Sequence, residues 1–338
     1  MKKRLLATFT SLCAMTVQLS AADAVLCGSV YSTSDASFVT GVYEIPLSPG
    51  ADFKLVGTTG EKATGGGFEA DGIYYLSELN NAYSFYGGNN VYPYSTDDWT
   101  SASSVYLSGS PAQYFMTSGF AVSPKGAGIY GFGANMDRDG YQLNKYEFDL
   151  SSANIERTLV ADVSSHLGAP AFDADGNLYA IDGAGCLYAV STADASVSKI
   201  GDTGIEPLVD GSYVPYIHAS SIFSAKTGKL IVAAQTASGA CALYEVGSAD
   251  AVAVKLLDFP AGVVVTGLYM AEGAAEPGAP AAVSELEAIF APGSLSGKIS
   301  FTAPGTTYGG DELSGMLDYR VLANGTQVAQ GRVYTNSG

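Results

Sequence analysis

The sequence predicts an all-β protein whose main part is a β-propeller, because one short phrase recurs five times at a blade-sized spacing. The phrase is a small residue, an apolar residue, a turn and then an apolar or aromatic strand. Abundant Gly (41 residues) and Tyr (22 residues), with 14% charged residues, suit many short strands joined by tight turns. The apolar anchors are separated by 52, 52, 50 and 46 residues, and they are Phe68, Phe120, Phe172, Ile222 and Leu268.

The period between Pro170 and Thr203 shows the predicted blade in most detail. Turn signals at Asp175-Gly176 and at 183–185 divide it into four antiparallel strands. Apolar residues alternate within these strands, as expected for a sheet packed between neighbouring sheets. The same template fits three further stretches, 68–107, 120–160 and 222–257.

The fifth blade is predicted to be assembled from both ends of the propeller. Residues 27–56 supply three outer strands but lack an innermost strand, and residues 265–270 supply one. We therefore expect the ring to close by pairing N-terminal and C-terminal strands in one sheet, which leaves only short, protected edges. Five blades follow from this count, and an unrecognised degenerate blade would make six.

Residues 1–22 are predicted to be an export signal peptide. Met1-Lys2-Lys3-Arg4 is basic, 5–19 is apolar and short, and Ser20-Ala21-Ala22 offers small residues for cleavage. The alternative, a buried N-terminal strand, fits poorly because consecutive basic residues are hard to place in a β core. No other apolar segment reaches the roughly 18 residues that span a bilayer. We expect a monomer that is secreted or exposed at the cell surface, on the Gram-negative outer surface or in the periplasm.

The charge of the exported chain excludes nucleic acid as a partner. Cleavage removes 3 of the 16 basic residues and leaves 13 against 33 acidic residues, a formal charge of 13 − 33 = −20. A phosphate backbone requires clustered Lys and Arg, which the sequence lacks. Cys27, Cys186 and Cys241 fall in three different predicted blades. We expect them to be small buried apolar side chains, with one bridge between two of them as the alternative.

A second domain is predicted after the propeller, which we assign to 23–272. Residues 273–281 are rich in Ala, Pro and Gly, have no aromatic residue and are predicted to be a linker. Residues 282–338 contain four further predicted strands of a partial β-sandwich, at 282–288, 298–303, 317–322 and 327–333.

This C-terminal part resembles a fibronectin type III domain of the sort found in secreted surface proteins of gut bacteria. The resemblance covers about 60 residues, and Phe301 stands where the family usually has Trp. It implies a spacer or interaction module that is completed by further sequence or by another chain. The matching residues are 281–286, 299–304, Leu313-Ser314-Gly315 and 319–325.

Two histidines, His166 and His218, fall in segments that link the outermost strand of one blade to the innermost strand of the next. Such segments gather at one end of a propeller, where ligands commonly bind. A catalytic role requires an adjacent nucleophile or carboxylate, for which the sequence offers Ser164, Ser165 and Asp210. A structural or exposed histidine is the favoured alternative.

Two acidic turns resemble calcium loops superficially, because they alternate carboxylates before a Gly. The turn 173–177 coincides with the hairpin found in every blade, so we favour a backbone role for it. Asp137 and Asp139 lie in a predicted rim loop and are candidate calcium ligands. Neither turn has the Glu that ends a twelve-residue calcium loop, and we predict no other cofactor.

Aromatic residues concentrate in the long predicted rim loops together with Asn80, Asn81, Asn89 and Asn90. Tyrosine combines a rigid stacking surface with a hydroxyl, which suits recognition of sugars or peptides. The alternative is that these rings fill the channel and pack adjacent blades. The candidate ligand-binding residues are Tyr83, Tyr86, Tyr114, Tyr141, Tyr213, Tyr216 and His218.

The leading functional hypothesis is a binding protein whose loop face recognises a glycan or an extracellular protein. An alternative is a carbohydrate-active hydrolase or lyase, with a carboxylate from Asp137, Asp139, Asp182 or Asp210; glycoside hydrolysis would need two acids at about 5–10 Å. A ligand-free structural spacer is the third. No recognisable catalytic motif is present, which favours binding.

Overall fold

The computed structural model divides the chain into two compact units, of which residues 25–271 form the larger. It describes residues 25–32, 38–60, 64–70, 72–78, 90–101, 103–108, 116–124, 128–134, 140–149, 154–208, 217–271, 280–281, 283–290, 297–307, 311–323 and 326–335. The predicted export signal, 1–22, lies outside these residues. The described part of the chain has no helix with the length and hydropathy needed to span a membrane.

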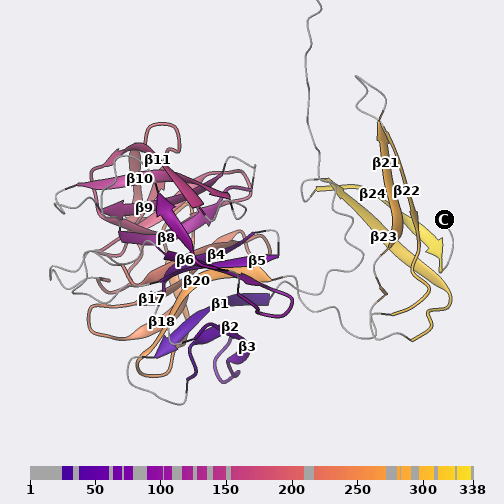
Figure 1. The fold of residues 1–338 in the computed structure, drawn as a ribbon, viewed down its shortest axis with the longest axis horizontal. Helices are drawn as coiled ribbons and strands as arrows, with labels where there is room; N and C mark the ends of the chain where they lie inside the picture. The colour runs from indigo at the N-terminus through magenta and orange to yellow at the C-terminus, as the bar shows by residue number, and fades with distance from the viewer. Residues whose placement is uncertain are drawn as a thin grey trace, which may run out of the picture. The chain divides into compact units, whose positions relative to one another are not determined.

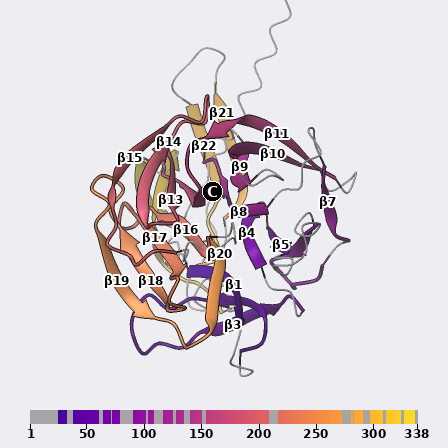
Figure 2. The same cartoon turned by 90° about the vertical axis from the view of Figure 1, so that its left-hand side faces the viewer.

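Residues 25–271 form a five-bladed propeller, and Figure 2 shows the blades arranged around a common axis. The chain order within a blade runs from the axis outward, with blade 1 split between the two ends. Each predicted anchor lies on an innermost strand. For blades 1 to 5 these strands are β20 (Val263–Ala271), β4 (Thr64–Ala70), β8 (Met116–Val122), β12 (Leu167–Phe172) and β16 (Ala219–Ser224).

The other strands follow outward in the same order in every blade. The second strands are β1 (Val25–Ser32), β5 (Ile73–Glu78), β9 (Ile129–Ala134), β13 (Leu178–Asp182) and β17 (Lys229–Gln235). The third strands are β2 (Gly41–Glu44), β6 (Asn90–Ser95), β10 (Tyr141–Asp149), β14 (Cys186–Val190) and β18 (Cys241–Val246). The outermost strands are β3 (Lys54–Thr58), β7 (Val105–Ser108), β11 (Asn154–Val163), β15 (Val197–Asp202) and β19 (Ala253–Asp258).

The ring closes through blade 1, as predicted. β1 pairs antiparallel with β20, from Val25 opposite Ala271 to Ser32 opposite Val263. The five innermost strands contact one another in ring order, and β8 also contacts β16 and β20 across the ring. The axis is therefore narrow at this level.

Small residues explain this close approach. A Cβ atom on Gly66 would lie 2.9 Å from the Cα atom of Gly119, and one on Gly119 would lie 3.1 Å from Cδ of Pro170. Where blades 4 and 5 meet, the Ser221 hydroxyl donates to the Ala169 carbonyl oxygen. Gly119 and Ser221, which directly precede the anchors Phe120 and Ile222, thus lie where neighbouring blades touch.

Blades 2 and 3 differ from the prediction because their outer edges pair with each other. β7 runs parallel to β11, with Tyr106, Leu107 and Ser108 opposite Asn154, Ile155 and Glu156. The two blades therefore share one eight-stranded sheet. The sequence of the four-residue β7 does not indicate this pairing. In the predicted blade the outermost strand pairs on its inner side only, so no partner is expected on its outer side.

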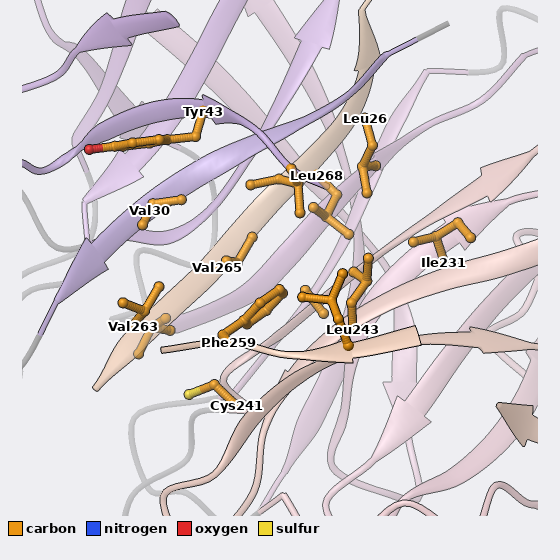
Figure 3. Close-up of a cluster of buried hydrophobic side chains, with 14 of the residues drawn as sticks. Leu26, Val30, Tyr43, Ile231, Cys241, Leu243, Phe259, Val263, Val265 and Leu268 are labelled. Atoms are coloured by element: carbon orange, nitrogen blue, oxygen red, sulfur yellow. The ribbon is translucent and has the colours of Figure 1, made fainter. Parts of the chain in front are cut away.

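The hydrophobic core lies between blades, and Figure 3 shows the part between blades 1 and 5. Val30 and Val265 of blade 1 face Leu243 and Phe259 of blade 5 there, and Val30 and Leu243 are fully buried. Alternating apolar residues thus point into the space between sheets. Among the described residues, Cys27, Cys186 and Cys241 of blades 1, 4 and 5 are free and buried, as predicted. Cys27 and Cys241 belong to such apolar layers.

The C-terminal unit contains two hairpins in its described part, drawn in yellow tones in Figure 1. β21 (Ser284–Phe290) pairs with β22 (Gly297–Thr302), and β23 (Met316–Ala323) pairs with β24 (Thr326–Tyr334). The rings of Phe301 and Tyr319 meet edge to face at 5.3 Å and join the hairpins. The described strands form two separate two-stranded sheets, so the all-β character is present but a complete sandwich is not shown.

Candidate functional site

The end of the propeller where the innermost strands begin carries both histidines. His166 lies between β11 and β12, and His218 directly precedes β16, so each is in a segment that links two blades. This is the placement that the sequence predicts. Each histidine contacts a tyrosine of a neighbouring strand.

His218 forms a partly buried pair with Tyr31 of blade 1. The Tyr31 hydroxyl lies 3.3 Å from Nδ1 of His218, and the Gln235 backbone N–H donates to the His218 carbonyl at 2.8 Å. Burial lowers the pKa of His218 and raises the pKa of Tyr31, because both charged forms lose solvation. Both side chains are therefore neutral near pH 7. The pair links the start of β16 in blade 5 to the end of β1 in blade 1.

His166 stacks on Tyr141, one of the predicted ligand-binding residues. The ring centroids are 4.7 Å apart with an interplanar angle of 13°. Next to this stack, the Gln142 side-chain amide donates to Oδ1 of Asp162 at 3.2 Å. Half-buried Tyr141 and His166 thus form part of the surface at this end of blade 3.

The remaining predicted site residues lie in the segments between described strands. For example, β5 ends at Glu78 and β6 begins at Asn90, and Tyr83 and Tyr86 fall between them in the sequence. They remain predictions, and the residues that lie outside the described part of the chain are Tyr83, Tyr86, Tyr114, Tyr213 and Tyr216, the calcium candidates Asp137 and Asp139, and Asp210.

Two described aspartates that sequence reasoning weighed for chemistry hold turns together. Oδ1 of Asp182 accepts from the backbone N–H of Cys186 at 2.8 Å, and Oδ2 accepts from the Tyr188 hydroxyl at 3.0 Å. Asp173 accepts from the backbone N–H and side-chain amide of Asn177, both at 2.8 Å. This is the backbone role favoured for turn 173–177. Within the described residues no three His, Cys, Asp or Glu side chains gather as a metal site.

A groove of about 880 Å³ lies between blades 1 and 5, and sequence reasoning did not identify it. One wall is β19, the outermost strand of blade 5, and the other is the loop between β2 and β3 of blade 1. These segments are about 200 residues apart in the chain. The groove is lined by Phe38, Tyr43, Ser48, Pro49, Gly50, Ala51, Asp52, Phe53, Lys255, Leu256, Leu257, Asp258 and Pro260.

An aromatic cluster forms the base of this groove. Phe53 meets Phe38 edge to face at 5.7 Å between ring centroids, and it meets Phe259 at 5.6 Å. Tyr43 packs on the same rings and donates its hydroxyl to the Val39 carbonyl at 2.8 Å. The Phe53 ring is thus held between the two blades, with part of its surface open to the groove.

The charged residues of the groove leave it with a negative balance. Lys255 forms an ion pair with Asp258, with Nζ and Oδ1 2.8 Å apart. Asp52 is exposed at the opposite wall and has no ion pair within the described residues. One uncompensated carboxylate therefore faces a mostly apolar groove.

No protein-family model matches the sequence, and no curated protein matches it. Solved structures with a similar fold include a candidate TolB from Agrobacterium tumefaciens (12% identity, TM-score 0.39, 73% of this chain and 99% of that chain). A gluconolactonase from Xanthomonas campestris has 14% identity and a TM-score of 0.36, over 57% of this chain and 61% of that one. An oligogalacturonate lyase in complex with manganese has 11% identity and a TM-score of 0.36, over 73% of each chain. These likenesses carry no inference about activity.

Proposed function

We propose that this chain is an exported recognition protein whose propeller binds an extracellular glycan or protein. The observation that carries the proposal is the groove between blades 1 and 5, a concave surface with an aromatic base and both polar and apolar side chains along its walls. Such a surface is typical of binding sites in proteins. Aromatic rings supply large contact area at low conformational cost, for either sugar faces or peptide side chains.

Binding is favoured over catalysis by what the described polar side chains do. Asp173 and Asp182 hold turns, and Asp258 is in an ion pair. His218 is half-buried, and its Nδ1 lies 3.3 Å from the Tyr31 hydroxyl. A general acid or base requires a titratable group within reach of a substrate, and these groups are committed to the fold.

Export and the role of the C-terminal unit belong to the same proposal. The basic start and short apolar run of 1–22 support secretion or surface exposure. The two hairpins of the C-terminal unit, joined by Phe301 and Tyr319, are in keeping with the first strands of a fibronectin type III-like sandwich. We assign this unit a spacer or interaction role.

The test is a binding screen of residues 23–338 against a glycan array and a panel of immobilised extracellular-matrix proteins. A groove variant carries Asp52→Lys and Phe53→Ala, and a loop variant carries Tyr83→Ala, Tyr86→Ala, Tyr213→Ala and Tyr216→Ala. Lys199→Ala, an exposed residue of blade 4, is the control. Circular dichroism verifies that each variant is folded.

We expect binding that the groove variant loses and the control keeps. Loss in the loop variant alone would move the binding site to the predicted rim loops. Absence of any binding to glycans and proteins would overturn the proposed function.

A further inference from the structure

We propose that the groove between blades 1 and 5 binds an extended, basic peptide segment of an extracellular protein, which adds as a strand to the outer edge of β19 at the residues that line the groove. The inference rests on the proposed function and narrows its ligand to a polypeptide in one conformation. It is carried by the edge of β19, the base of the groove and its charge.

The groove follows the edge of β19. Lys255, Leu256, Leu257 and Asp258 are consecutive, and all four line it. A register shift between Lys255 and Leu257 interrupts the alternation of side chains, and Leu256 and Leu257 both pack toward blade 1. Lys255 is instead paired with Tyr244, which packs in the cluster between blades 4 and 5. A groove that residues of both faces reach lies at the strand's edge. β19 pairs on its inner side with β18 and is the last strand of its sheet. Its outward backbone groups therefore border the groove.

An outermost strand of this same propeller already accepts a further strand. β11 holds the same position in blade 3 as β19 does in blade 5, and β7 pairs with it in parallel. Unpaired strand edges are templates for added strands, and peptide recognition commonly uses them. In blade 3 the added strand, β7, comes from the same chain. In blade 5 a segment of a partner protein would pair with β19 in the same way.

The groove also provides side-chain contacts for alternate residues of such a peptide. Phe38, Phe53 and Pro260 form apolar contact surface beside the strand edge. Val254 of β19 is 53% exposed, although it is a large apolar residue on an edge strand. An added strand would cover apolar surface of this kind, and burial of apolar surface favours binding.

Charge favours a basic peptide. Asp258 is neutralised by Lys255, whereas the carboxylate of Asp52 on the opposite wall has no ion pair within the described residues. The whole chain has a formal charge of −17. A Lys or Arg of the peptide placed beside Asp52 would neutralise the negative charge of the groove. The net negative charge of the protein would also speed association with a basic peptide at low ionic strength.

The test begins with a random linear decapeptide library displayed on phage and selected on residues 23–338. Enriched peptides are synthesised and their affinity is measured by fluorescence polarisation. Each peptide is then N-methylated at one backbone position at a time. In an added strand only every second residue hydrogen-bonds to β19. We therefore expect N-methylation to weaken binding at least tenfold at alternate positions and to have little effect at the positions between them.

A pair of variants with the same charge change tests the groove itself. Asp52→Lys should weaken binding of a basic peptide at least tenfold. Asp175→Lys, in the exposed hairpin turn of blade 4, should leave it within twofold. Raising the ionic strength should reduce the affinity of the wild-type chain.

The outcomes separate this inference from the proposed function. Enriched peptides whose binding ignores N-methylation at every position, or ignores Asp52→Lys, would overturn strand addition in the groove. Binding of glycans with no peptide enrichment would overturn the inference and leave the proposed function standing. Failure in both screens would overturn both.

Discussion

The Tyr74 hydroxyl donates a hydrogen bond of 2.9 Å to the Gly267 carbonyl oxygen, 193 positions further along the chain. The contact joins β5 of blade 2 to the innermost strand of blade 1. Tyr74 is fully buried, so the bond satisfies two polar groups that water does not reach. It stabilises the place where the ends of the propeller come together.

Removal of this hydroxyl should destabilise the propeller. Tyr74→Phe leaves the Gly267 carbonyl buried without its donor, and we expect a loss of about 1–3 kcal/mol in the free energy of unfolding. Urea titration followed by circular dichroism measures it. Tyr334→Phe, at a 63% exposed tyrosine of the C-terminal unit, should change little. Equal losses in the two variants would contradict the role given to Tyr74.

A methyl group at Gly267 should destabilise the propeller more than a methyl group at an exposed glycine whose φ is also positive. Gly267 has φ +56°, and a Cβ atom there would lie 2.8 Å from the backbone N of Gly67. We expect Gly267→Ala to cost about 2–5 kcal/mol, the sum of backbone strain and overpacking. Gly204→Ala, with φ +74° and no atom within 4 Å, should cost about 1–2 kcal/mol. Thermal unfolding of the two variants side by side distinguishes crowding from strain alone.

His218 should make the propeller less stable in mild acid. Its pKa is lowered in the folded chain because burial disfavours the charged imidazolium, so the unfolded chain binds the proton more readily. The stabilising contribution of the neutral ring is complete above the ordinary histidine pKa of about 6.5. It is lost as the pH falls from there through the lowered pKa of His218.

Unfolding midpoints measured between pH 5 and pH 8 test this. His218→Gln should flatten the profile over that range, whereas His166→Gln should retain the slope. A wild-type stability that rises as the pH drops below 6.5 would show that the imidazolium form is accommodated after all.

Cys27 and Cys241 should be inert until the chain unfolds. Burial raises the pKa of Cys27 and Cys241 to about 11, and the thiolate is the reactive form. We expect iodoacetamide to leave Cys27 and Cys241 unmodified in native residues 23–338 and to modify both in denaturant, as located by peptide mass mapping. A native mass loss of 2 Da relative to the reduced chain would reveal a disulfide and contradict the free thiols.

The repeated phrase predicts the ring well because its parts have local physical causes. The anchors Phe120 and Phe172 lie on innermost strands, and Gly119 before Phe120 is where a Cβ atom would crowd Pro170 of the next blade. Residues 42–45 also resemble residues 187–190 in sequence, and the structure places the two segments alike. Tyr43 and Tyr188 occupy the same place beside a register shift in the third strand of their blades.

The groove lay beyond sequence reasoning because no local pattern encodes it. In the sequence, Phe53 is a single apolar residue after a predicted loop, with nothing to indicate its partners. Its ring becomes part of a groove only because blade 5 brings Phe259 against it. The β7–β11 pairing was missed for a related reason: parallel neighbours are joined by tertiary packing, not by a hairpin turn. The pairing of His166 with Tyr141 could have been anticipated, since both flank blade ends on one side of the ring.

The strand pairing that closes blade 1 also determines how the propeller would respond to mechanical load. Val25, where the chain enters the ring, is the direct partner of Ala271, where the chain leaves it. Tension between the two flanking segments therefore acts on one end of the β1–β20 ladder. The backbone bonds would break one after another, as in unzipping, instead of sharing the load as in shear. A pull between these ends would open the ring at blade 1 first, with the sheets of blades 2 to 5 still paired.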